Sequence, residues 1–175
     1  MSPLFSKRHQ QGAVAIEFAA IFLLFFTLVY GIIAFSLPAV VRLAFQHYST
    51  EAARAAVKVD PSVESGRFAQ LVSQQVTREI TSSWLPAAWR DSCPAPNDGT
   101  TWAALPSHAG QPSYGYWQVE VNARPGRTPR YRLYVCLQTR GSIVPQIRLG
   151  DIELPTLPRD TTGRPVIRGY TLTTF

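Results

Sequence analysis

The sequence predicts an α+β protein in which a long N-terminal helix crosses a membrane and carries a small exported domain. Three observations lead to this fold class. An uncharged apolar run, Phe18–Val41, is followed by amphipathic helical patterns and then by two segments of alternating character, residues 116–123 and 130–138. We therefore expect three parts: a cytoplasmic leader at 1–12, a transmembrane and extended helix at 13–59, and an α+β domain at 60–175.

The apolar run is long enough to cross a bilayer. A hydrocarbon core of about 30 Å needs about 20 residues of helix, at a rise of about 1.5 Å each. A cleaved secretory signal is the alternative, but the apolar part of such a signal has only about 7–15 residues. Lys7 and Arg8 precede the helix and no acidic residue occurs before Glu17. The positive-inside rule therefore places the N-terminus in the cytoplasm and the domain on the far side.

The helical pattern continues beyond the apolar run. Apolar residues recur there at alternating spacings of four and three: Val41, Phe45, Tyr48, Ala52, Ala55 and Val59. This heptad-like stripe either docks on the protein's own domain or contacts neighbouring subunits. Docking within the chain is the default, because most amphipathic faces bury against their own core. Pro38 lies inside the same helix and removes one backbone hydrogen bond, so we expect a kink near the outer interface.

The exported part begins with a second helix. Asp60-Pro61 ends the long helix and suits the start of another, since Asp is a favoured N-cap and Pro fits the first turn. Apolar residues at helical spacing mark this second helix: Phe68, Leu71, Val72, Val76, Ile80 and Trp84. Residues 86–112 are rich in Pro, Gly, Ser, Asn and Asp, which predicts a long irregular connection.

The two alternating segments predict an antiparallel hairpin, with Pro125-Gly126 in the turn. Residues 144–149 and 166–173 are weaker strand candidates. Cys93 and Cys136 both fall in the exported part, where an oxidising compartment allows a disulfide between the irregular connection and the hairpin. Two free buried thiols are the alternative. Because Cys136 falls on the polar side of its strand, we expect it under a loop rather than deeply buried.

The exported part carries no pattern typical of catalysis or metal binding. The three histidines, His9, His47 and His108, are far apart and lack metal-ligand spacing with the cysteines. Its acidic residues are scattered in turn-like sequence: Asp91, Asp98, Asp151, Glu153 and Asp160. The formal charge is +6, but dispersed arginines favour a solvated basic surface over a nucleic-acid site. We expect a protein that acts by binding, not an enzyme, with no cofactor and no nucleic-acid partner.

The most specific pattern lies where the apolar helix begins. Residues 12–19 read GAVAIEFA, residues 31–35 read GIIAF and residues 51–56 read EAARAA. A basic leader that ends in Gly12, followed by a lone Glu17 and a long apolar helix, resembles the signal of type IV pilins and pseudopilins. Across residues 1–58 the chain resembles the TadE-like family, which comprises minor pseudopilins of the tight-adherence (Tad, Flp) pilus.

The resemblance implies roles for three residues. A prepilin peptidase would cleave between Gly12 and Ala13, and Glu17 would accept the new N-terminal ammonium of a neighbouring pilin or pseudopilin. The other implied partner is the pilus assembly platform of the bacterial inner membrane, with the domain in the periplasm and a possible place in the surface pilus. From the residues alone, Glu17 merely reaching toward the headgroups is the alternative. The alternative function is a signal-anchored envelope protein whose exported domain binds a ligand or surface polymer.

Overall fold

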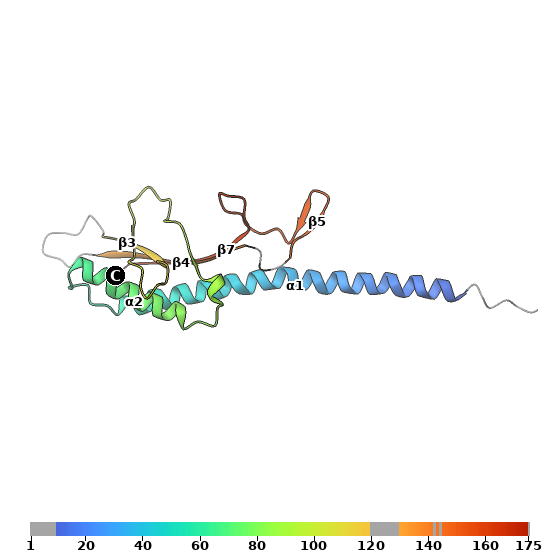
Figure 1. Cartoon of the computed structure of the whole chain (residues 1–175), viewed down its shortest axis with the longest axis horizontal. Helices are drawn as coiled ribbons and strands as arrows, with labels where there is room; N and C mark the ends of the chain where they lie inside the picture. The colour runs from blue at the N-terminus through green and yellow to red at the C-terminus, as the bar shows by residue number, and fades with distance from the viewer. Residues whose placement is uncertain (1–9, 120–129, 142, 144, 175) are drawn as a thin grey trace, which may run out of the picture.

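The computed structural model describes residues 10–119, 130–141, 143 and 145–174. One long helix, α1 (Gln10–Val57), runs beside the other elements with its N-terminal half projecting alone (Figure 1). The remaining elements are α2 (Ser65–Thr81), the 3-10 turn η2 (Ala87–Trp89), β1 (Asp91–Ser92), β2 (Ala103–Ala104), β3 (Gly115–Val119), β4 (Tyr131–Arg140), β5 (Ile147–Leu149), β6 (Ile152–Leu154) and β7 (Val166–Thr174). The predicted α+β class is confirmed.

Helix α1 has 48 residues, which is about 72 Å at 1.5 Å per residue. It begins three residues before the predicted start at Ala13 and ends at Val57, two residues before the predicted end. A turn follows, in which Val59 N donates to Ala56 O at 3.1 Å. Pro38 lies inside α1, and the helix continues through it. The kink at Pro38 stays a prediction.

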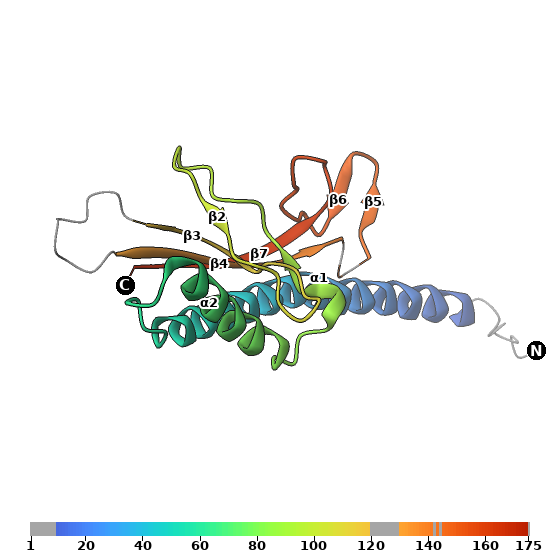
Figure 2. The ribbon, with the colours of Figure 1, turned by 60° about the vertical axis from the view of Figure 1, so that its left-hand side comes forward.

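The apolar stripe of α1 docks on the protein's own domain, as the sequence predicted. Val41, Phe45 and Ala52 are at most 2% exposed and belong to the same buried cluster as residues of α2 and β4. Two helices therefore cover one face of the sheet (Figure 2).

Helix α2 starts later than predicted. Asp60 does not cap it: the Asp60 carboxylate accepts a hydrogen bond from Ser62 N at 2.8 Å and closes a local turn, and α2 begins after Glu64. An Asp side chain that bonds two residues ahead stabilises a turn instead of a helix start. Phe68, Val72, Val76 and Ile80 are buried as predicted, and Leu71 is partly buried. The prediction was wrong for Trp84, which lies beyond the end of α2 at Thr81 and is 61% exposed.

The main sheet is built around β4, its longest strand. Strands β3 and β1 pair with β4 along one edge and β7 pairs along the other, all antiparallel. The predicted hairpin is thus confirmed as β3–β4, with Tyr116 opposite Tyr134, although its turn at Pro125-Gly126 lies outside the described residues. The predicted strand at 166–173 corresponds to β7. The weaker candidate at 144–149 yields only β5, which pairs with β6 in a separate two-stranded hairpin.

Strand β7 lies unusually close to α1. A Cβ built on Gly169 would be 2.5 Å from the backbone nitrogen of Gln46, so only glycine fits there without movement. Two polar contacts join the same elements: Ser49 Oγ donates to Gly169 O at 3.2 Å, and the hydroxyls of Thr50 and Thr171 lie 2.8 Å apart. Small residues therefore fix the long helix to the last strand.

Candidate functional site

The N-terminal part of α1 holds the residues to which the sequence assigned processing and assembly. Gly12 and Ala13 both lie in the first turn of the helix, whereas we expected the helix to begin at Ala13, after Gly12. The first four N–H groups of a helix lack intrahelical partners, so this turn opens at little cost. Nothing lies within 4 Å of a Cβ built on Gly12. Glu17 is exposed and lies four residues, about one turn, after Ala13.

The projecting half of α1 is bare and apolar. Residues 14–28 are all exposed, with Phe18 at 67% and Phe25 at 58%. Among the described residues, α1 is the one helix long and apolar enough to cross a membrane. Such exposed apolar area on one helix needs lipid or other apolar helices around it.

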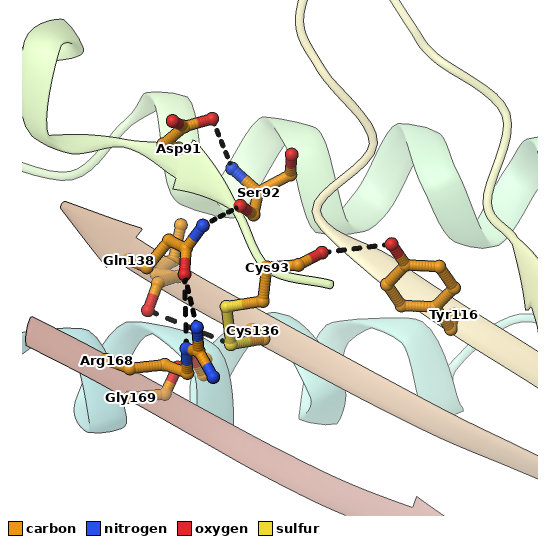
Figure 3. The surroundings of a disulfide bond; sticks show 10 residues. Asp91, Ser92, Cys93, Tyr116, Cys136, Gln138, Arg168 and Gly169 are labelled. Atoms are coloured by element: carbon orange, nitrogen blue, oxygen red, sulfur yellow. Dashed lines mark hydrogen bonds between the residues drawn. A yellow bond between two sulfur atoms is a disulfide. The ribbon is translucent and has the colours of Figure 1, made fainter. Parts of the chain in front are cut away.

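The part of the chain that follows α1 contains the predicted disulfide between Cys93 and Cys136, whose Cα atoms are 5.8 Å apart (Figure 3). The expected burial was wrong, since Cys136 is 1% exposed and Cys93 4%. Cys136 does lie on the outer face of β4, but β1 and the residues after it cover that face. Tyr116 helps to hold this cover, because its hydroxyl donates to Cys93 O at 2.9 Å.

Beside the disulfide, a buried amide fixes an arginine on the outer face of the sheet. Gln138 is 4% exposed, and its Oε1 accepts hydrogen bonds from Nε and Nη2 of Arg168 at 3.1 and 2.9 Å. The Gln138 amide nitrogen donates in turn to Ser92 O, on the strand that leads into Cys93 (Figure 3). The Arg168 guanidinium is therefore oriented by a neutral partner, and among the described residues no carboxylate forms an ion pair with it.

Arg168 lies in a cleft of about 1010 Å³. The cleft lining includes five arginines and one acidic residue: Arg42, Arg140, Arg159, Arg164, Arg168 and Asp160. Hydrogen bonds from the Thr162 hydroxyl and from the backbone N–H of Arg164 lower the pKa of Asp160 and occupy its carboxylate. An excess of guanidinium groups over carboxylates makes the cleft attractive to anionic groups.

Aromatic side chains continue this outer face away from the cleft. The ring centroids of Tyr134 and Tyr170 are 5.5 Å apart, and those of Tyr134 and Trp102 are 6.2 Å apart. The Arg132 guanidinium lies over the Trp102 ring at 5.4 Å. Tyr170 is 58% exposed, so the outer face offers an aromatic surface of the kind enriched at protein interfaces.

The acidic residues that looked scattered in the sequence are partly paired. Glu153 forms ion pairs with both Arg148 and Arg159, and Asp91 pairs with Arg140 at 2.8 Å. In the part of the chain that the structure describes, no group of three or more His, Cys, Asp or Glu side chains is placed to hold a metal ion.

These features define the class of protein: a small α+β domain carried on an apolar helix that can span a membrane. The family model described as TadE-like protein matches residues 12–54, so this segment of the chain is TadE-like, as its residues predicted. The matched stretch lies within α1 and does not include α2 or the sheet. No curated protein and no solved structure matches the chain.

The basic cleft is the feature that sequence reasoning missed. It unites residues from α1, the segment around Cys93, β4, β7 and the loop before β7. The alternating pattern of β4 places Gln138 on the same face as Cys136. No local pattern indicated that Arg168 would contact Gln138. For the close approach of α1, the glycine within a strand pattern at Gly169 was an available signal.

Proposed function

We propose that this chain is a pseudopilin-like minor subunit or assembly factor of a Tad (type IVb) pilus. The observation that carries the proposal is the TadE-like match over residues 12–54, on a helix whose residues 14–28 are all exposed. A helix of this kind resides in the inner membrane. When it leaves the bilayer, its contacts with lipid are replaced by contacts with the helices of other subunits. The chain acts by binding and performs no chemistry of its own.

Processing prepares this helix for assembly. Prepilin peptidase cleaves between Gly12 and Ala13 at the cytoplasmic face, where the first helical turn opens easily. Cleavage removes the basic leader and creates an α-amino group one turn before Glu17. The periplasmic domain then stays attached through the docked stripe of α1 while the helix moves.

Glu17 provides the charge that selects a neighbour. A carboxylate within hydrocarbon costs about 2.5–3.5 kcal/mol on insertion scales, so it gains from meeting an opposite charge. The N-terminal ammonium of an adjacent pilin or pseudopilin supplies that charge and sets the axial register of the two subunits. The domain interacts with other pilus components, for which the outer-face aromatic surface is available.

The experiment compares Glu17→Gln with Glu51→Gln in cells that make the pilus. Glu17 is exposed on α1, whereas Glu51 is partly exposed, lies beyond the apolar run and pairs with Arg54 on the same helix. Glu17→Gln should insert and be cleaved normally, yet lose co-purification with other pilins and pilus assembly. Glu51→Gln should assemble like the wild type. Normal assembly of Glu17→Gln with intact cleavage would remove the register role of the charge.

A second candidate function rests on the basic cleft. In this alternative the chain is a signal-anchored envelope protein whose exported domain binds an anionic ligand or surface polymer and never enters a pilus. Processing distinguishes the two candidates. A membrane-extracted protein that retains residues 1–12, or that begins beyond Ser36, would favour the second candidate over the first.

A further inference from the structure

The domain reaches far down the apolar part of α1. Residues 14–28 are exposed, and the first partly covered residues are Val29 and Tyr30, in the middle of the uncharged run Phe18–Val41. The Tyr30 hydroxyl donates to Pro145 O at 2.7 Å, and Ala34 is only 1% exposed. Part of the apolar run is therefore covered by protein and not available to lipid.

The segment that reaches this level of α1 carries charged side chains. It contains Pro145, whose carbonyl meets Tyr30, and the β5–β6 hairpin, which stands off the helix beside its middle part in both ribbon views (Figures 1 and 2). Glu153 on this hairpin holds two arginines, Arg148 and Arg159, and the Arg148 side chain is 74% exposed. A two-stranded hairpin also leaves backbone N–H and C=O groups unpaired along its edges. Such groups are not tolerated where lipid hydrocarbon is the solvent.

The apolar run therefore cannot lie entirely in hydrocarbon. If the hydrocarbon extended to Val41, the level of Tyr30 would be about 16 Å below its outer edge, at 1.5 Å per residue. The hairpin and its three charged side chains would then be submerged. If the hydrocarbon ends at Tyr30 instead, its cytoplasmic edge lies near Gln10 and Glu17 is about 10 Å inside it. A single carboxylate costs about 2.5–3.5 kcal/mol on insertion scales, which is less than the cost of a charged hairpin with open edges.

We propose that the outer edge of the hydrocarbon lies at Tyr30, and that residues 145–157 rest on the phospholipid headgroups of the outer leaflet. This inference rests on the membrane residence in the proposed function. In the uncleaved chain, residues 10–29 span about 30 Å, the thickness of the hydrocarbon core, and the basic residues at 7–9 precede them. Tyr30 takes the interfacial position that tyrosine favours, and Arg148 faces the phosphate groups.

This placement leaves a length of apolar helix outside the bilayer. Phe35, Val40 and Leu43 are 55–66% exposed, and in this placement they lie above the headgroups on the side of α1 away from the domain. The membrane-spanning part is thus the TadE-like stretch before Tyr30, and the hairpin fixes how deeply the subunit sits.

Cysteine accessibility tests the boundary. Three exposed residues of α1 are replaced one at a time: Ala20→Cys, Ser36→Cys and His47→Cys. Ser36 lies about 9 Å outside the hydrocarbon if it ends at Tyr30, and about 7 Å inside if it ends at Val41. Ala20 lies inside the hydrocarbon if it ends at Tyr30 and at its cytoplasmic edge if it ends at Val41, so a reagent outside the cell reaches it in neither case. His47 lies outside the hydrocarbon in both cases. Spheroplasts that make the full chain without other pilus proteins are treated with a membrane-impermeant maleimide, which the disulfide-bonded Cys93 and Cys136 do not react with.

The expected result is that Ser36→Cys is labelled at the rate of His47→Cys, whereas Ala20→Cys is labelled only after denaturation in detergent. Protection of both Ser36→Cys and Ala20→Cys would overturn the boundary at Tyr30 and leave the membrane-spanning helix intact. Labelling of all three in intact spheroplasts would overturn the membrane residence itself, and with it the proposed function.

Discussion

Replacement of Gly169 by alanine should loosen the junction between the long helix and the domain. A Cβ at this position would lie 2.5 Å from the backbone nitrogen of Gln46 and 2.7 Å from the backbone carbonyl carbon of Phe45. Ordinary contacts of a Cβ are 3.4–4 Å, and backbone atoms cannot rotate away as a side chain can. Strand β7 and α1 must therefore separate by roughly 1 Å in Gly169→Ala.

This separation has a calculable cost. Overpacking a buried contact by one methyl group destabilises a protein by about 1–3 kcal/mol. For a chain of this size each 1 kcal/mol lowers Tm by about 2–4 °C, so Gly169→Ala should unfold about 2–12 °C below the wild type. The Ser49–Gly169 and Thr50–Thr171 hydrogen bonds bridge the same gap and would lengthen with it.

Thermal unfolding of the full chain in detergent, followed by near-UV circular dichroism, measures the effect. Gly66→Ala is the matched control, because Gly66 lies in α2 with nothing within 4 Å of a built Cβ. Alanine there should raise stability by up to about 1 kcal/mol through helix propensity. If Gly169→Ala unfolds at the wild-type temperature while the control behaves as expected, the close approach does not limit how α1 docks.

Three further outcomes are expected. N-terminal mass spectrometry of the membrane-extracted protein should find a mature chain that begins at Ala13, and a chain that still begins at Met1 would contradict cleavage after Gly12. Reduction of the disulfide, whose cysteines are 43 residues apart, should lower the free energy of unfolding by about 2–4 kcal/mol, whereas quantitative labelling of two thiols in periplasmic material would contradict the bond. Hydrogen bonds from Thr100 and Trp102 lower the pKa of Asp98 from 3.8 to about 2. The loop they hold should keep its form as pH falls until about pH 2, and an NMR titration of the Trp102 indole N–H with a midpoint near 3.8 would contradict this.

Local patterns predicted the elements that depend on local periodicity. The stripe that contains Phe45 and the alternation in β4 are read directly from spacing, because burial against one face imposes a period of about 3.6 in a helix and 2 in a strand. The same reasoning identified α2 but misplaced its start. The Asp60 carboxylate could cap a helix or close a local turn, and it closes the turn by accepting a hydrogen bond from Ser62 N.

Features that join distant segments could not be predicted in the same way. Cys136 lies on the polar side of its strand, as the pattern indicated, but its burial depends on a cover that arrives from the segment around Cys93. The basic cleft has the same origin, since Gln138 and Arg168 meet only because β4 and β7 pair in one register. The composition shows an excess of basic over acidic residues but does not indicate where the guanidinium groups gather.

The contact between Ser49 and Gly169 also determines when this protein can finish folding. The two residues are 120 positions apart, so the strand that covers the middle of α1 is synthesised long after the helix itself. At about 5–20 residues per second, the interval is roughly 6–24 s. Throughout that time β7 does not yet cover the apolar stripe of α1, and the apolar side chains of this stripe can contact other newly synthesised chains. A chain with this order of elements can therefore bury that part of α1 only after its last strand has been synthesised.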